Sequence, residues 1–263
     1  MKFGLTNKVA LVTGGSSGIG MATALALATE GCRVCIVARN QAKLDVAVAQ
    51  IYAATSSEII GLSGDVVNAA EMLAHLDEIR KRMGAIDILV NNAGGPPPGS
   101  FLEHDDLVWA ETLERNFMSV VRLSRAVAPA MKERRWGRII NVTSTIAKEP
   151  TPVMVLSASA RAAVSAFTKA ISGELAPFNV TVNTLCPGGV DTERVADLMA
   201  QTALREDKPL AEILKRSVSM IPAQRFATAA EIGAVMTFLA SEQASYLTGL
   251  SLMADGGLTK GVF

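Results

Sequence analysis

The chain has 263 residues, of which 49% are hydrophobic, and its 25 basic and 25 acidic residues cancel. This length and composition predict one α/β domain with a large core, spanning residues 1–263. A net charge of zero gives no reason to expect a nucleic acid or an anionic membrane as partner. The first residues lack a secretory signal and no segment is long and apolar enough to cross a membrane, so we expect a cytoplasmic protein.

Short apolar segments alternate with helical segments along the chain. Buried strands are expected at residues 8–13, 33–38, 58–63, 86–90, 137–143, 180–185 and 250–254. Helices are expected at about 18–30, 41–54, 68–83, 105–133, 156–176 and 228–240. Near-continuous apolar strands separated by helices predict a doubly wound parallel sheet with helices on both faces.

The three cysteines give no disulfide framework. Cys32 and Cys35 have the spacing of a redox pair, but they lie in an expected strand, where alternation makes them face opposite ways. We therefore interpret them as structural free thiols, which fit a reducing compartment. No metal site is expected.

The segment from Thr13 to Gly20 reads TGGSSGIG and joins the first strand to the first helix. Gly14 allows a tight turn, Gly18 lets the backbone approach a diphosphate, and Gly20 lets the helix pack close to the strand. The helix N-terminus adds unpaired amides and a positive dipole end. A glycine triplet alone is also typical of a flexible turn, but this position between strand and helix predicts dinucleotide binding. The other expected contacts in the segment are Ser16, Ser17 and Ile19.

The end of the second strand indicates which dinucleotide binds. An acidic residue there would accept a hydrogen bond from the ribose 2′-hydroxyl of NAD, but the chain has Arg39 followed by Asn40. The planar fork of Arg39 can pair with a 2′-phosphate, and Ser16 or Asn40 could share that phosphate. We expect NADP in preference to NAD, with NAD kept as the alternative. Arg39 could instead be a surface residue that caps the next helix.

Later strands are followed by further motifs: Asp65-Val66, Asn91-Asn-Ala-Gly94, Asn116 in the long helix, Ser144, and the segment PGGVDT at 187–192. With the glycine segment, they make the chain resemble the short-chain dehydrogenase/reductase family, of the kind that includes 3-oxoacyl carrier-protein reductases. The resemblance covers nearly the whole chain. It implies a Rossmann-like sheet of seven strands in the order 3-2-1-4-5-6-7, and a homotetramer or homodimer built on the two long helices.

The resemblance also implies roles at the cofactor. Asp65 would accept a hydrogen bond from the adenine amino group, with the Val66 amide nearby. Residues after the fourth strand would form the wall beside the adenosine ribose, and residues after the sixth strand would contact the nicotinamide or the diphosphate. Ordinary turn chemistry is the alternative for each position alone. The two sets are Asn91, Ala93 and Gly94, and Pro187, Gly188, Val190 and Thr192.

One part of the family pattern is replaced. In the family, an Asn in the long helix, a Ser after strand five, a Tyr, and a Lys four residues beyond it form a proton-transfer set. Asn116 and Ser144 are present, but the usual spacing of thirteen residues from that Ser leads to Ser157, and four more lead to Arg161. Residues four apart on a helix share a face, roughly 6 Å apart along the axis. Arg161 keeps a charge that can serve the cofactor ribose, whereas a serine is far less acidic than a phenol.

Three hypotheses follow. The first is an NADP-dependent oxidoreductase for a carbonyl or alcohol substrate, in which Ser144, Ser157 and Arg161 hydrogen-bond the substrate oxygen and a water delivers the proton. The second is a nucleotide-binding protein without redox turnover. The third is a non-redox lyase, isomerase or dehydratase with other acids or bases above the site. The candidates for that role are His104, Lys148 and Glu149.

Residues 191–220 fit the strand and helix alternation poorly, since they are long and mixed in polarity. We expect a mobile substrate lid here. Its apolar side chains favour a hydrophobic or acyl-type substrate, although they could equally pack the segment back onto the body. They are Val195, Leu198, Met199 and Leu204.

Overall fold

A computed structural model describes residues 2–261 of the chain, and a parallel sheet runs through these residues. Its strands lie in the order β3-β2-β1-β4-β5-β6-β9. Two short strands, β7 and β8, lie outside this sheet, so β9 is its seventh strand. The predicted order 3-2-1-4-5-6-7 is therefore confirmed. The strands are β1 (Val9–Thr13), β2 (Arg33–Ala38), β3 (Ile59–Ser63), β4 (Ile88–Asn91), β5 (Gly137–Val142), β6 (Val180–Pro187) and β9 (Ser251–Ala254).

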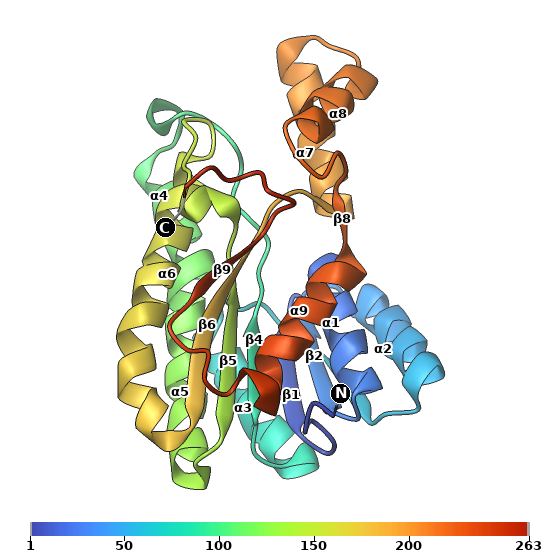
Figure 1. The fold of residues 1–263 in the computed structure, drawn as a ribbon, viewed down its shortest axis with the longest axis vertical. Coiled ribbons are helices and arrows are strands. Elements are labelled where there is room, and N and C mark those ends of the chain that lie inside the picture. Colours follow the sequence, from blue (N-terminus) through green and yellow to red (C-terminus); the bar gives the residue numbers. More distant parts are fainter. Residues whose placement is uncertain (1, 262–263) are drawn as a thin grey trace.

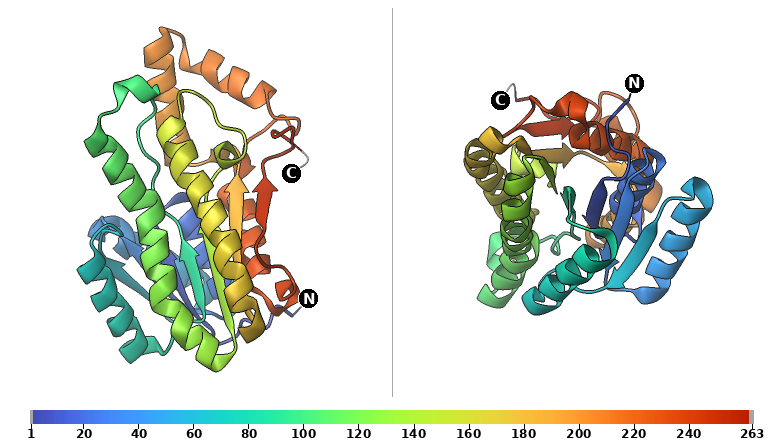
Figure 2. Two further views of the ribbon diagram at one scale, coloured as in Figure 1. Left: turned by 90° about the vertical axis from the view of Figure 1, so that its left-hand side faces the viewer. Right: turned by 90° about the horizontal axis from the view of Figure 1, so that it is seen from below.

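Helices cover both faces of the sheet (Figures 1 and 2). One face carries α1 (Gly18–Thr29), α2 (Gln41–Thr55) and α9 (Ala229–Ala240). The other carries α3 (Ala69–Met83), α5 (Ser119–Arg134) and α6 (Val155–Leu175). In the described part of the chain, no helix is both long and apolar enough to span a membrane.

The strands are apolar on both sides because each one feeds two cores. Along β1, Ala10 and Val12 pack into the core under α1 and α9, whereas Val9 and Leu11 pack into the core under α3 and α5. The same alternation separates Cys32 from Cys35, which lie in opposite cores as free thiols. Burial raises the pKa of each thiol to about 12.

The long helix expected at 105–133 is interrupted. It consists of α4 (Asp106–Leu113), a π-helical turn at Glu114–Met118, and α5. Such a turn inserts one residue into the helix and shifts the side chains around it. Asn116 lies inside this turn and is buried.

The segment expected to form a lid contains two helices, α7 (Glu193–Glu206) and α8 (Leu210–Ser219). They project beyond the carboxyl ends of the strands (Figure 1). A two-stranded parallel ladder at the base of this segment joins β7 (Val190–Asp191) to β8 (Ala227–Thr228). The helices therefore leave and rejoin the body of the protein beside the end of β6.

Candidate functional site

A cavity of about 960 Å³ lies at the carboxyl ends of the strands, and the first half of α7 lines one side of it. Ligands of open α/β sheets bind at this edge. All the predicted site residues line it except Gly20, Asn91 and Asn116. The predicted residues that do are Gly14, Ser16, Ser17, Gly18, Ile19, Arg39, Asn40, Asp65, Val66, Ala93, Gly94, Ser144, Ser157, Arg161, Pro187, Gly188, Val190 and Thr192.

The glycine turn forms a cradle that fits a diphosphate. Gly14 and Gly18 have φ values of +60° and +52°, which side chains rarely adopt. A Cβ on Gly20 would lie only 2.1 Å from the carbonyl oxygen of Gly14, so α1 can approach the turn only with glycine there. Ser17, at the N-cap of α1, makes no side-chain capping bond. The first amides of α1 therefore remain available to an anion in the cavity.

Arg39 lies at the exposed end of β2 and lines the cavity. Within residues 2–261 its guanidinium forms no ion pair. Asn40, not Arg39, caps α2, since its side chain accepts a hydrogen bond of 2.9 Å from the Lys43 amide. Arg39 is exposed, as the alternative interpretation expected, but it does not cap α2. Its planar fork is therefore available to a phosphate.

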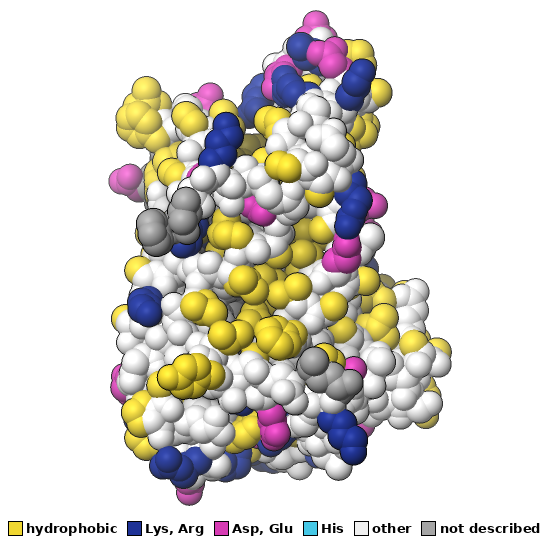
Figure 3. All heavy atoms as spheres, viewed as in Figure 1, with side chains coloured by type: hydrophobic (Ala, Val, Ile, Leu, Met, Phe, Trp, Pro, Cys, Tyr) yellow, Lys and Arg dark blue, Asp and Glu magenta, His cyan; other side chains and the backbone are white. Residues whose placement is uncertain are grey.

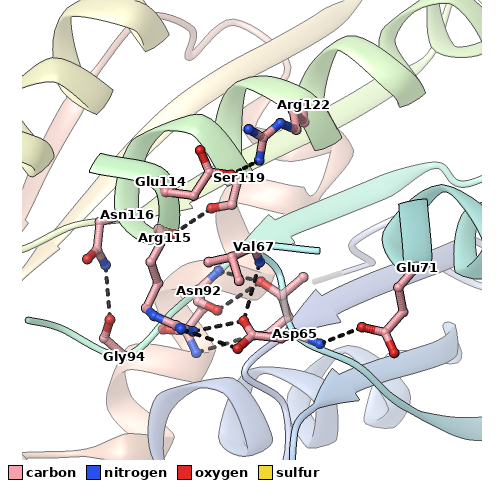
Figure 4. A network of polar contacts seen from close by, with 11 residues as sticks. Asp65, Val67, Glu71, Asn92, Gly94, Glu114, Arg115, Asn116, Ser119 and Arg122 are labelled. Carbon is pink, nitrogen blue, oxygen red and sulfur yellow. Dashed lines mark hydrogen bonds and ion pairs between the residues drawn. The ribbon is translucent and has the colours of Figure 1, made fainter. Parts of the chain in front are cut away.

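Asp65 does not lie free in the cavity (Figure 4). Both of its carboxylate oxygens accept hydrogen bonds from Arg115, at 2.8 and 3.2 Å. Partial burial would raise the pKa of Asp65, but the hydrogen bonds from Arg115 and from the Val67 amide outweigh burial and lower it. Sequence reasoning missed Arg115, whose only signal was a basic residue directly before Asn116. A carboxylate oxygen of Asp65 that accepted a hydrogen bond from an adenine amino group would at the same time accept one from Arg115.

Asn91 does not reach the cavity. Its side chain is 3% exposed and donates a hydrogen bond of 2.8 Å to Asn141 within the sheet. Its neighbour Asn92 points the other way, lines the cavity, and donates to the carbonyls of Thr13 and Gly14 at 3.3 Å each. The expected contact of Asn91 with the adenosine ribose therefore has no support in the geometry. Asn92 instead braces the glycine turn.

Asn116 borders a second, smaller cavity of about 10 Å³ together with Asn91 and Arg161. Its amide nitrogen donates to the carbonyl of Gly94 at 3.0 Å (Figure 4). The side-chain oxygens of Asn116 and Asn91 are both buried and accept no hydrogen bond from the described residues. A space of this size with two such acceptors suits a single water molecule.

Ser157 and Arg161 form one unit on α6. Arg161 Nε donates to Ser157 Oγ at 3.0 Å, and Nη1 donates to the carbonyls of Val142 and Thr143 at the end of β5. Burial, and then the charge of Arg194, lower the pKa of Arg161 to about 10. The buried Ser157 and the half-exposed Ser144 line the same cavity. Ser144, Ser157 and Arg161, which were expected to surround the substrate oxygen, therefore line one cavity.

The first turn of α7 contacts both walls of the cavity. Glu193 forms an ion pair of 2.7 Å with Lys43 on α2. Arg194 donates to the carbonyls of Pro96 and Gly95, at 2.9 and 3.3 Å. Sequence reasoning did not single out Glu193 or Arg194, although both follow Thr192 directly. Through these contacts α7 covers part of the cavity.

The candidate acids and bases of the non-redox hypothesis do not lie at the cavity. His104, Lys148 and Glu149 are absent from its described lining. Glu149 instead accepts hydrogen bonds from the amides of Lys260 and Gly261, at 2.6 and 2.9 Å. Among residues 2–261, no group of three or more His, Cys, Asp or Glu side chains could hold a metal ion.

Comparisons with known proteins agree with this geometry. A family model for short chain dehydrogenases matches residues 8–203. The chain is 36% identical to nodulation protein G of Azospirillum brasilense over 257 residues, covering 97% of this chain and 99% of the relative. It is 35% identical to the 3-oxoacyl-acyl-carrier-protein reductase FabG of Escherichia coli strain K12 over 256 residues, covering 95% and 97%.

Two solved structures have the same fold over nearly their whole length. The L-sorbose reductase of Gluconobacter frateurii, complexed with NADPH and L-sorbose, superposes with a TM-score of 0.94 at 31% identity and covers 100% of both chains. YwfH, an NADPH-dependent reductase involved in bacilysin biosynthesis, gives a TM-score of 0.93 at 32% identity and covers 97% of this chain and 99% of its own. Sequence motifs, sheet order, cavity and relatives lead to one conclusion: the chain belongs to the short-chain dehydrogenase family.

Proposed function

We propose that the protein is an NADP-dependent oxidoreductase that reduces a carbonyl substrate or oxidises the corresponding alcohol, with an altered proton-donor site. The observation that carries the proposal is that Ser144, Ser157 and Arg161 line one cavity with the glycine turn and Arg39. When bound, NADPH supplies the hydride that reduces a carbonyl carbon. The two similar structures described as NADPH-bound or NADPH-dependent support NADP over NAD.

The cofactor would be held by residues of this chain along the cavity. The α1 N-terminus and the turn at Gly14 and Gly18 would bind the diphosphate, and Arg39 the 2′-phosphate. The nicotinamide end would be held by residues from the end of β6 to the N-cap of α7, which are Pro187, Gly188, Val190 and Thr192. Asp65 and Arg115 would border the adenine together, since the carboxylate is already held by the guanidinium.

The substrate oxygen would lie against Ser144, Ser157 and Arg161. Because Ser157 Oγ already accepts a hydrogen bond from Arg161, its own hydrogen is directed to another acceptor. Arg161 adds a positive charge, and preorganised donors of this kind stabilise a developing oxyanion. The oxygen would take its proton from a water molecule. A proton from solvent would neutralise the hydroxide that this water leaves behind.

We further propose that residues 191–220 are the substrate lid of a single domain. The contacts of Glu193 and Arg194 with the cavity walls support this role. Leu198 lines the cavity, and this apolar side chain is compatible with a hydrophobic or acyl-type substrate. FabG, a relative named for acting on 3-oxoacyl carrier protein, supports the same class.

Self-association into a homodimer or homotetramer is also proposed. Figure 3 shows hydrophobic side chains gathered across the middle of the face that carries β9 and α9. Three exposed apolar residues belong to these elements or adjoin them: Phe238 of α9, Leu252 of β9, and Leu250 directly before β9. On α6, Ala162 and Ala170 are exposed, as an interface with close helix approach would need. Light scattering at several protein concentrations tests this assembly.

The buried free thiols support a reducing compartment, and hence a cytoplasmic location.

The decisive experiment measures oxidation of NADPH and NADH with a panel of carbonyl compounds. We expect the wild type to turn over with NADPH. Ser157→Ala should lower kcat by about 100-fold, as for the loss of one oxyanion donor. Ser165→Ala, on the same helix, is the matched control and should keep wild-type activity. The proposal is wrong if the wild type binds NADPH but is inert and only Ser157→Tyr/Arg161→Lys turns over, since the pocket would then lack only its acid.

A further inference from the structure

Two guanidinium groups converge at the reacting end of the cavity. Nη2 of Arg161 and Nη2 of Arg194 each lie 3.6 Å from the position that a Cβ on Gly95 would occupy. Arg161 comes from the middle of α6, and Arg194 comes from the first turn of α7. Both line the cavity beside Ser157. Elements far apart in the sequence thus direct two positive charges at one point beside the proposed oxygen site.

No carboxylate of the described chain balances these two charges. Within residues 2–261, neither Arg161 nor Arg194 takes part in an ion pair. Asp65 and Glu193 are the two acidic residues that line the cavity, and each is already paired with another basic side chain. The reacting end of the cavity therefore has an excess of positive charge.

Each guanidinium also keeps donors for a ligand. Arg161 uses Nε and Nη1 for protein acceptors, and its Nη2 donates to none of the described residues. Arg194 uses only Nη2, for the carbonyls of Gly95 and Pro96. Two like charges that face one space repel each other, and an anion between them removes that repulsion. Burial is the main cause that lowers the pKa of Arg161 to about 10, and the charge of Arg194 lowers it further.

We propose that Arg161 and Arg194 bind a carboxylate of the substrate, so that the substrate is an oxo acid or the corresponding hydroxy acid. Nη2 of Arg161 and a nitrogen of Arg194 other than Nη2 would each donate to one of the two carboxylate oxygens. Because Arg161 is bonded to Ser157, the carboxylate would lie next to the carbonyl that is reduced. The substrate identity rests on the proposed function, whereas carboxylate binding can be measured without turnover.

Binding is tested with malonate, a carboxylate that the enzyme cannot reduce, by calorimetry with and without NADP⁺. We expect malonate to bind the wild type and to bind Arg194→Gln roughly 10- to 100-fold more weakly, as for the loss of a charged hydrogen bond. Arg194→Lys keeps the charge but has one nitrogen for both the loop carbonyls and the ligand, so its malonate affinity should lie between those of the wild type and Arg194→Gln. Arg205→Gln, an exposed arginine of the same helix, is the control and should match the wild type. Loss of NADP⁺ affinity in Arg194→Gln with unchanged malonate binding overturns the inference, since Arg194 would then serve the cofactor.

Turnover is tested with two pairs of compounds, acetoacetate with methyl acetoacetate and pyruvate with methyl pyruvate. In the wild type, at least one acid should have a KM roughly 10- to 100-fold below that of its ester. Arg194→Gln should raise the KM of that acid and leave the KM of its ester unchanged. Equal KM values for acid and ester in both pairs overturn the inference. If neither acids nor esters turn over while malonate still binds through Arg194, the proposed function fails and the carboxylate site stands.

Discussion

The contact between α1 and the glycine turn gives the sharpest test of the cofactor site. In Gly20→Ala, the added Cβ would lie 2.1 Å from the oxygen and 2.7 Å from the carbonyl carbon of Gly14. Both atoms belong to the backbone, so no side chain can rotate away. Ordinary contact requires the turn or the helix to move by roughly 1 Å. This shift changes the position of the amides that would hold the diphosphate.

The magnitude follows from two opposing effects. Overpacking of this kind costs about 1–3 kcal/mol, while alanine is favoured over glycine in a helix by about 0.5–1 kcal/mol. We therefore expect Gly20→Ala to lower the free energy of unfolding by about 1–2 kcal/mol. NADPH affinity should fall by about tenfold or more, since binding depends on the displaced amides. The assays are urea unfolding at fixed protein concentration and fluorescence titration with NADPH.

Gly173→Ala in α6 is the matched control, since no atom lies within 4 Å of its added Cβ. This variant should gain about 0.5–1 kcal/mol in unfolding free energy and keep wild-type NADPH affinity. If Gly20→Ala instead binds NADPH as tightly as the wild type, the reasoning that this turn positions the diphosphate is refuted. If it behaves like Gly173→Ala in both assays, the close packing of α1 on the turn has no energetic consequence.

Three further predictions concern residues outside this contact. Arg39→Asp should weaken NADPH binding relative to NADH; an unchanged preference would remove Arg39 as its cause. Arg115→Met should lower the unfolding free energy by about 1 kcal/mol at pH 7. Because Arg115 keeps the folded-state pKa of Asp65 low, this ion pair stabilises the fold above the ordinary carboxylate pKa and is lost as pH falls through the lowered value. The difference between variant and wild type should thus shrink toward pH 3 in pH-dependent urea unfolding, and a constant difference would contradict it. Cys32 and Cys35 should not react with a thiol reagent at pH 8 until the protein unfolds, and rapid labelling of the native protein would argue against their burial.

The sheet could be predicted from sequence because its strands are buried on both faces. Every residue of Val9–Thr13 is buried, because successive side chains enter the cores on opposite faces of the sheet. A short, nearly continuous apolar run of this kind is typical of a strand that is covered on both faces. The interruption near Asn116 could not be predicted, since a π turn adds one residue without breaking the apolar pattern of the flanking helices. The helices α7 and α8 were missed although apolar side chains recur on one face of each, because the mixed polarity of residues 191–220 was interpreted as a lid and not as an amphipathic pattern.

Most of the residues that line the cavity could be predicted because their positions depend on the backbone. A tight turn at the end of a strand often requires glycine at particular positions, because only glycine adopts positive φ without strain. Gly14 and Gly18 have such φ values, and their spacing can be recognised in the sequence. Arg115 and Arg194 were missed because a long side chain can reach a site from several directions. Their contacts with Asp65 and with the carbonyl of Pro96 depend on how distant elements pack. Sequence motifs therefore locate such a cavity more reliably than they identify the charges inside it.

The replacement of the expected Tyr and Lys involves two coupled positions. Arg161 reaches Ser157 Oγ with Nε and the end of β5 with Nη1, whereas a lysine would have to reach both from a single nitrogen. A tyrosine ring at position 157 would occupy the space next to this guanidinium, because Ser157 is buried and already in contact with it. The small serine and the forked arginine thus depend on each other. Their effects on activity should not be additive, since each single change leaves the partner with an unsatisfied or crowded group. What the pair retains is a fixed positive charge and an oriented hydroxyl, which can stabilise an oxyanion and hold an anionic substrate without a phenol.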